Sequence, residues 1–234
     1  MTAFFTLHQD LPREGPGDRE SLDWALTLAA PPRDGQILDA GCGPGADLLD
    51  LVAHVPDGRV IGLEQHAPFV EAAAARVAEE RRVDVRHGDM AAAEGPFDVI
   101  WCAGALYFLG VEAGLRGWRS ALAPGGAVVF SDAVWLGAEC PETARRQWEE
   151  YPGMTDIPGT LARIEAAGYR SMGHRVLSDA AWEAYYTPLE RRIAALSPGA
   201  DPALAAVLDE GWREIEVWRA HRDAFGYGLF VARA

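Results

Sequence analysis

Short apolar runs alternate with amphipathic stretches through about the first 135 residues of the chain. The helical spacing of apolar residues predicts helices at 18–30, 46–54, 68–80 and 111–122. The apolar runs predict strands at 36–39, 59–64, 83–86, 97–102 and 127–131. Strands that alternate with helices form βαβ units, so we expect a doubly wound parallel sheet with helices on both faces.

The pattern changes after this region. Residues 139–168 are expected to be helical and rich in turns, and 169–177 is expected to be a strand. Residues 179–222 are mainly helical apart from a break at Ser197-Pro198-Gly199, and the chain closes on an aromatic strand at 225–231. We predict a single domain over 1–234, in which 36–135 is the ligand-binding core.

The composition of the chain limits the classes of partner, the chemistry and the cellular location that we expect. Acidic residues outnumber basic ones by 35 to 21, for a formal charge of −14, which argues against a nucleic-acid partner. Every basic residue is an arginine, so Schiff-base chemistry and a P-loop lysine are excluded. No apolar run is long enough for a membrane span, and the first residues do not resemble a signal peptide. Three widely spaced cysteines without a CxxC pair predict no metal site and a cytoplasmic location.

A glycine-rich turn follows the first predicted strand and carries the main functional signal. Gly41, Gly43 and Gly45 allow a tight turn and close approach to a ligand at a helix N-terminus. Their spacing also fits a relaxed dinucleotide fingerprint. Asp39, two residues before Gly41, favours a cationic ligand and would oppose a pyrophosphate.

Two later strand ends add features of an adenosine site. The second strand ends at Glu64, where a carboxylate can accept two hydrogen bonds from a ribose diol. Gly88-Asp89-Met90 follows the third strand, and a carboxylate beside an apolar side chain can bind the amino group and the face of adenine. Glu64 alone does not distinguish nicotinamide from adenosylmethionine sites.

Taken together, these motifs resemble class I S-adenosylmethionine-dependent methyltransferases. The resemblance covers about 36–135 and rests on Asp39-Ala40-Gly41-Cys42-Gly43-Pro44-Gly45, Glu64, Gly88-Asp89-Met90, Phe97-Asp98-Val99-Ile100 and Leu122-Ala123-Pro124-Gly125-Gly126. It implies a Rossmann-like seven-stranded sheet of order 3-2-1-4-5-7-6 with the last strand antiparallel. It also implies S-adenosylmethionine as cofactor. The cofactor contacts that follow from it are Arg13, Asp39, Gly41, Cys42, Gly43, Glu64, Gln65, Asp89, Met90 and Cys102.

The flanking segments look like a bacterial subgroup that acts on small molecules. Leu11-Pro12-Arg13-Glu14-Gly15-Pro16-Gly17 and Tyr151-Pro152-Gly153-Met154 carry this likeness. Relatives often have Ser-Glu-Gly-Ala where this chain has Cys102-Ala103-Gly104-Ala105, so Ala103 leaves the acceptor open. The resemblance implies a helical substrate lid from 1–30 and 136–168, with Tyr107, Trp135 and Tyr151 as substrate contacts.

The expected reaction needs little dedicated machinery. The methyl donor arrives activated, so the protein mainly aligns donor and acceptor, and no nucleophilic side chain stands out. A hydroxyl or acidic carbon acceptor would use a general base, for which His8, Asp132 and His174 are candidates by location.

Three alternatives stay open at this point. An NAD(P)-dependent oxidoreductase shares the glycine loop and Glu64, although a Tyr-x-x-x-Lys pair cannot exist without lysine. A non-catalytic S-adenosylmethionine-binding protein would look the same in sequence. A nucleic-acid methyltransferase is disfavoured by the acidic balance. A homodimer is compatible with the sequence but is not indicated by it.

Overall fold

All the predicted strands form, and they join one sheet in the computed structural model, which describes residues 2–137 and 139–234. In chain order the strands are β1 (Gln36–Ala40), β2 (Arg59–Glu64), β3 (Val83–His87), β4 (Phe97–Ala103), β5 (Leu122–Trp135), β6 (Thr155–Asp156), β7 (Arg170–Val176) and β8 (Phe225–Arg233).

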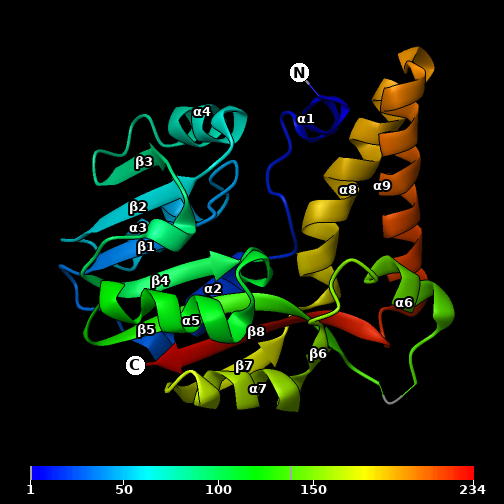
Figure 1. Cartoon of the computed structure of the whole chain (residues 1–234). Helices are drawn as coiled ribbons and strands as arrows, with labels where there is room; N and C mark the ends of the chain where they lie inside the picture. The colour runs from blue at the N-terminus through cyan, green and yellow to red at the C-terminus, as the bar shows by residue number, and fades with distance from the viewer. Residues whose placement is uncertain (1, 138) are drawn as a thin grey trace.

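The strand order along the sheet is β3-β2-β1-β4-β5-β8-β7 (Figure 1), which is the predicted order once β6 is set aside. The predicted count of seven strands was wrong, because β6 makes an eighth by pairing with the last two residues of β5. A strand of two residues is too short to show any periodicity in the sequence. The last strand, β8, runs antiparallel to both of its neighbours, as predicted.

The helices after residue 18 follow the predicted pattern, most of them with shorter bounds, and α1 was not predicted. They are α1 (Ala3–His8), α2 (Arg19–Ala29), α3 (Leu48–Ala53), α4 (Ala67–Arg76), α5 (Val111–Trp118), α6 (Glu142–Gln147), α7 (Ile157–Ala166), α8 (Asp179–Leu196) and α9 (Pro202–His221). Short 3-10 turns are η1 (Met90–Ala92), η2 (Leu106–Phe108), η3 (Arg119–Ala121) and η4 (Ser197–Gly199). The Asp18 side chain caps α2 by accepting a hydrogen bond from the Ser21 amide, 2.7 Å away.

Helices cover both faces of the sheet, as a parallel sheet requires. The core on one face is formed with α2, α3 and α4, and the core on the other with α5 and α7. Strand β4 contributes side chains to both cores: Val99 and Trp101 belong to the first core, while Ile100 and Cys102 belong to the second. Side chains therefore alternate between two apolar layers along one strand.

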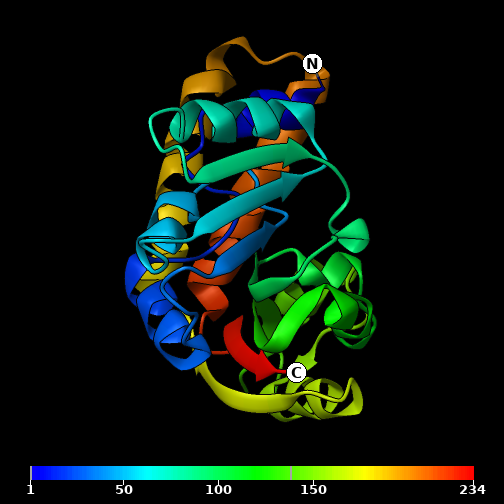
Figure 2. The same cartoon turned by 90° about the vertical axis from the view of Figure 1, so that its left-hand side faces the viewer.

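Helices α8 and α9 lie beyond the carboxyl ends of β1 and β4 (Figure 1) and stand behind the sheet in Figure 2. Helix α1 packs against both of them, and α6 packs against α9. In contrast, α2 lies on β5 and β8, and α7 packs on α5 and β7. In each of the segments 1–30 and 136–168, one helix packs on the sheet side and the other lies beyond the carboxyl edge of the sheet. The role of these segments as a substrate lid stays a prediction. Within the described residues, every helix is too short or too polar to cross a bilayer.

Candidate functional site

The glycine loop follows β1 at the carboxyl edge of the sheet and is tied to the neighbouring strand. The amides of Gly41 and Cys42 donate hydrogen bonds to the Leu63 carbonyl at 2.8 and 3.1 Å. Gly41 has φ of +75°, and a Cβ there would lie 2.9 Å from the Cβ of Ala105, which follows β4. Only glycine fits this close approach, so the loop is held between the ends of β2 and β4.

Glu64, the last residue of β2, lies against this loop. Its Oε2 accepts a hydrogen bond from the Gly43 amide at 3.1 Å, and its Oε1 accepts one from the His66 amide at 2.8 Å. The residue is 6% exposed, so a buried carboxylate sits at the strand end where a ribose diol was expected. The two hydroxyls of a ribose are suitable donors for such a carboxylate.

Two further carboxyl groups surround the loop. Asp39 in β1 is buried, and this burial, together with the nearby Asp47 and Glu64, holds its pKa well above the usual range. The Asp47 carboxylate accepts hydrogen bonds from Trp101 Nε1 at 3.0 Å and from Arg13 at 3.3 Å. A bound cation would favour the ionised form of Asp39, whereas a pyrophosphate would add negative charge to this cluster.

Arg13 is the one predicted cofactor contact that comes from the N-terminal segment, and it contacts Asp47, which follows the glycine loop. Besides its contact with Asp47, it lines a small cavity together with Trp101 of β4. The hydroxyls of Ser21 and Ser131, on the same cavity, are buried and have no hydrogen-bond partner among the described residues. The cavity is only about 10 Å³, room for about one water molecule, and Asp18 and Asp47 line it beside the arginine and the two hydroxyls.

The residues predicted to bind adenine follow β3 at the same edge. Asp89 is exposed, and its carboxylate accepts a hydrogen bond from the Ala91 amide at 2.8 Å. Met90 turns toward the glycine loop, since a Cβ on Gly41 would lie 3.5 Å from its sulfur. Gln65 is exposed beside Glu64. The ends of β1, β2 and β3 therefore bring these residues to one edge of the sheet, as the sequence predicted.

The two cysteines in the predicted cofactor set lie in different places. Cys42 is in the glycine loop, and a Cβ on Gly62 would lie 3.0 Å from its sulfur. Cys102 is fully buried in the core beneath α5, so its side chain does not face the loop. Burial raises the pKa of both thiols, and the negative charge of Asp39 adds to this effect. Neither thiol is suited to act as a nucleophile.

Asp132 of β5 is buried and forms a hydrogen-bonded pair with Tyr151, which is partly buried. The Tyr151 hydroxyl donates to Asp132 Oδ2 at 2.8 Å, and the Ala133 amide donates to Oδ1 at 3.0 Å. Burial raises the pKa of Asp132 to about 6, although both hydrogen bonds and the charge of Arg163 oppose the rise. The ring of Tyr107 lies 5.4 Å from that of Tyr151. Asp132 is thus a carboxyl group that changes protonation near physiological pH.

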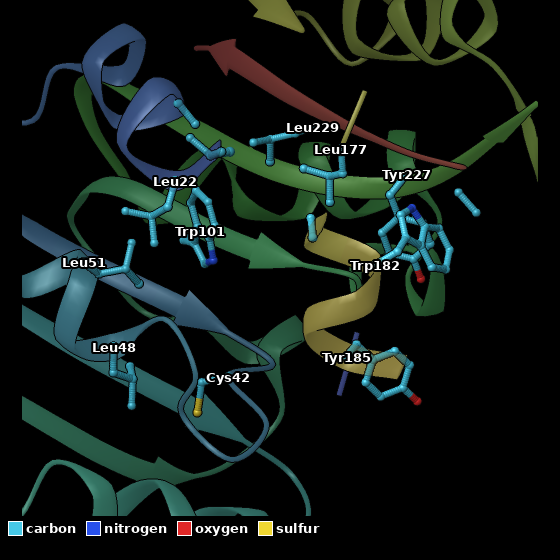
Figure 3. Packing of buried hydrophobic residues seen from close by; sticks show 14 of the residues in the cluster. Leu22, Cys42, Leu48, Leu51, Trp101, Leu177, Trp182, Tyr185, Tyr227 and Leu229 are labelled. Atoms are coloured by element: carbon cyan, nitrogen blue, oxygen red, sulfur yellow. The ribbon is translucent and has the colours of Figure 1, made fainter. Parts of the chain in front are cut away.

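More residues join this region than the sequence indicated. Tyr227 of β8 lies over the end of β4, because a Cβ on Gly104 would be 3.3 Å from its ring. Tyr185 and Glu214 come from α8 and α9, and Glu214 accepts a hydrogen bond from Tyr186 at 2.9 Å. Figure 3 shows Tyr185, Trp182 and Tyr227 gathered on one side of the apolar cluster, away from Leu48. The sequence predicted that 179–222 is mainly helical, but not which of its rings lie beside Tyr227.

The remaining candidates, His8, His174 and Trp135, lie in different parts of the structure. His8 in α1 contacts the Glu14 carboxylate and stacks on Phe4. His174 is exposed on β7, where its ring stacks on Phe230, and no contact joins it to Asp132. Trp135 ends β5, where it pairs with Phe225 of β8. The structure therefore brings Asp132, Tyr107 and Tyr151 together and leaves His174 apart.

Comparisons with known proteins agree with this arrangement. Residues 37–126 match the family described as "Methyltransferase domain". A demethylmenaquinone methyltransferase of Roseiflexus sp. (strain RS-1) is 38% identical over 68 residues, which are 29% of this chain and 29% of that protein. A nocamycin O-methyltransferase of Saccharothrix syringae is 34% identical over 125 residues, 50% of this chain and 42% of that protein. The chain thus spans less than half the length of either relative.

The fold extends the likeness to nearly the whole chain. A S-adenosylmethionine-dependent methyltransferase from Geobacter sulfurreducens, solved in complex with S-adenosyl-L-homocysteine, superimposes with a TM-score of 0.83. The superposition covers 98% of this chain and 96% of that one, at 20% sequence identity. The match to the methyltransferase domain thus covers β1 to the start of β5, and the fold around it is the one found in this solved structure.

Proposed function

We propose that the protein transfers a methyl group from S-adenosylmethionine to a small-molecule acceptor and releases S-adenosylhomocysteine. The observation that carries this proposal is the set of carboxyl groups around the glycine loop, namely Asp39, Asp47 and Glu64. These groups favour a sulfonium and an ammonium, which are both cations, and they oppose the pyrophosphate of a nicotinamide dinucleotide. The oxidoreductase alternative is therefore not supported.

Specific residues would hold the cofactor. Glu64, whose carboxylate lies against the glycine loop, would accept hydrogen bonds from the ribose hydroxyls, and Asp89 would accept one from the adenine amino group. Met90 would cover the adenine ring, and Arg13 would bind the methionine carboxylate beside Asp47. When bound, the cofactor supplies an activated methyl group on its sulfonium. The glycine loop and the end of β4 orient the reacting groups.

Asp132 is the candidate for proton acceptance on the acceptor side. It is ionised at neutral pH because its pKa of about 6 lies below 7, and Tyr151 fixes the orientation of its carboxylate. Tyr107 and Tyr151 present rings beside it. This arrangement suits an acceptor that loses a proton when it is methylated. Relatives named for demethylmenaquinone and nocamycin support a small-molecule acceptor.

The surroundings of the protein are part of the proposal. The three free thiols, Cys42, Cys102 and Cys140, suit a reducing cytoplasm. The charge of −14 disfavours a nucleic-acid substrate. A homodimer stays a prediction that light scattering after size exclusion would decide.

Turnover tests the proposal directly. Purified protein is incubated with S-adenosylmethionine and pools of amines, phenols, alcohols and carboxylic acids, and S-adenosylhomocysteine is measured by mass spectrometry. We expect S-adenosylhomocysteine above the acceptor-free control with at least one pool, and its loss in Asp132→Asn for an acceptor that must lose a proton. Binding of the cofactor without turnover in every pool would instead favour a binding protein.

A further inference from the structure

Three tyrosines, Tyr107, Tyr185 and Tyr227, have buried or partly buried rings near the end of β4. Tyr185 and Tyr227 are 6% and 8% exposed, and Tyr107 is partly buried. In the described part of the chain, none of their hydroxyls has a hydrogen-bond partner, and none belongs to the polar atoms sealed from solvent. The Tyr227 oxygen would lie 3.8 Å from a Cβ on Gly104, which places it at the end of β4. Buried rings with free hydroxyls at this edge indicate a ligand with polar groups.

Negative charge dominates the surroundings of these tyrosines. Burial raises the pKa of Tyr107 to about 12, and the nearby Glu214 and Asp132 contribute to the rise. The pKa of Tyr185 and that of Tyr227 are raised by burial and, again, by Glu214. Glu214 acts on all three rings. It accepts a hydrogen bond from Tyr186, whose ring lies 5.1 Å from that of Tyr185. Burial raises the pKa of Glu214 itself, and a bound cation would favour its ionised form. An anionic acceptor would therefore be repelled from this cluster.

Two basic side chains act on the carboxyl groups of this region, His8 on Glu214 and Arg163 on Asp132, and both already have partners. The His8 ring contacts the carboxylate of Glu14. The Arg163 guanidinium donates a hydrogen bond of 2.6 Å to the Gly153 carbonyl and lies near Asp132. One Arg163 N–H is thus engaged by a backbone carbonyl, and the His8 ring is paired with a carboxylate. The region instead offers aromatic rings and carboxylates, the two features that bind an ammonium ion.

We propose that the methyl acceptor is an amine, bound as an ammonium ion among Tyr107, Tyr185 and Tyr227 with Glu214 as its counter-charge. Asp132 accepts one proton from the ammonium. The free lone pair of the nitrogen then forms the new N–C bond to the methyl carbon as the C–S bond breaks, and the bonding pair stays on sulfur. The methylated nitrogen carries the positive charge that the sulfonium loses. This inference rests on the proposed methyl transfer and specifies its acceptor.

Binding of charged and neutral probes tests the inference without turnover. Protein saturated with S-adenosylhomocysteine is titrated by calorimetry with benzyltrimethylammonium, which cannot be methylated, and with benzyl alcohol and benzoate. We expect benzyltrimethylammonium to bind about tenfold or more tightly than benzoate, because carboxylates and ring faces attract it. Tighter binding of benzoate, or no binding of the cation, would overturn the inference.

Matched variants separate the charge from the fold. Glu214→Gln should weaken the binding of benzyltrimethylammonium about fivefold or more and leave the binding of benzyl alcohol unchanged, since the substitution removes only the charge. Glu216→Gln is the control, because Glu216 is exposed on the same helix and should change neither probe. Equal binding of the cation by both variants contradicts the inference. If thermal melting shows that Glu214→Gln does not fold, Asp132→Asn replaces it in the same comparison.

The S-adenosylhomocysteine titration comes first and keeps the two proposals apart. If S-adenosylhomocysteine does not bind, the proposed methyl transfer fails. If it binds and the cation shows no preference over benzoate, only the amine acceptor fails.

Discussion

At the scale of single residues, the pKa of Asp132 depends on its burial and on its neighbours. Burial raises its pKa from 3.8 to about 6, while the hydrogen bonds from Tyr151 and the Ala133 amide and the charge of Arg163 lower it. Hydrogen bonds that stabilise the ionised form keep a buried carboxylate available as a proton acceptor. In the proposed reaction, Tyr151 would therefore act on the acceptor through Asp132 as well as through its own ring.

Removing the Tyr151 hydroxyl should raise the pKa of Asp132 further. In Tyr151→Phe we expect the titration midpoint to move upward from about 6 by about one pH unit, because one hydrogen bond to the ionised form is lost. Carbon NMR of the labelled carboxyl group measures the midpoint, and Asp132→Asn assigns the resonance. Turnover that needs ionised Asp132 should decline as the pH falls through the same midpoint. An unchanged midpoint would show that the hydroxyl does not stabilise this carboxylate.

At the scale of elements, the sequence allows the strands and their functional ends to be predicted. Apolar runs ending at Asp39 and Glu64 predicted both strands, because both faces of a parallel sheet are buried. The short β6 carries no such pattern. The positions of Tyr185, Tyr227 and Glu214 depend on how α8, α9 and β8 pack across the chain, which local periodicity does not report.

Helix α1 illustrates an element that tertiary packing holds in place. Its six residues are too few for stability alone, yet Leu7 is 1% exposed. Gly211 of α9 lets the helices approach, since a Cβ there would lie 3.5 Å from Leu7 Cδ2 and 3.1 Å from Ile193 Cδ1. On its other side, Phe5 contacts Phe69 of α4, with ring centres 5.4 Å apart. Helix α1 thus connects the cofactor half of the molecule to α8 and α9.

Shortening the Leu7 side chain tests how much the packing of α1 contributes to the free energy of unfolding. Leu7→Ala is expected to lower the free energy of unfolding by about 2–5 kcal/mol, because a fully buried leucine leaves a cavity. Phe4→Ala is the control: Phe4 is 45% exposed, and we expect a cost below about 1 kcal/mol. Urea denaturation measures both. Similar costs for the two variants would mean that α1 is not packed as described.

At the scale of the whole molecule, the two halves of the reaction are assigned to different parts of the chain. The ends of β1, β2 and β3 carry the groups proposed to bind the cofactor. The acceptor region combines the ends of β4 and β5 with β8, α8 and α9. Residues that are far apart in sequence thus meet at one edge of the sheet, as is usual for doubly wound folds.

The central claim is that this edge binds an adenosylmethionine-type ligand through the Glu64 carboxylate, and calorimetry tests it most directly. We expect S-adenosylhomocysteine to bind the unmodified protein and NADH not to bind. Glu64→Ala should weaken the binding of S-adenosylhomocysteine by about 1–3 kcal/mol, since buried ribose hydroxyls lose a charged acceptor. Glu79→Ala, an exposed residue, should have no effect. Binding of NADH without S-adenosylhomocysteine, or equal affinity in Glu64→Ala, would contradict the account.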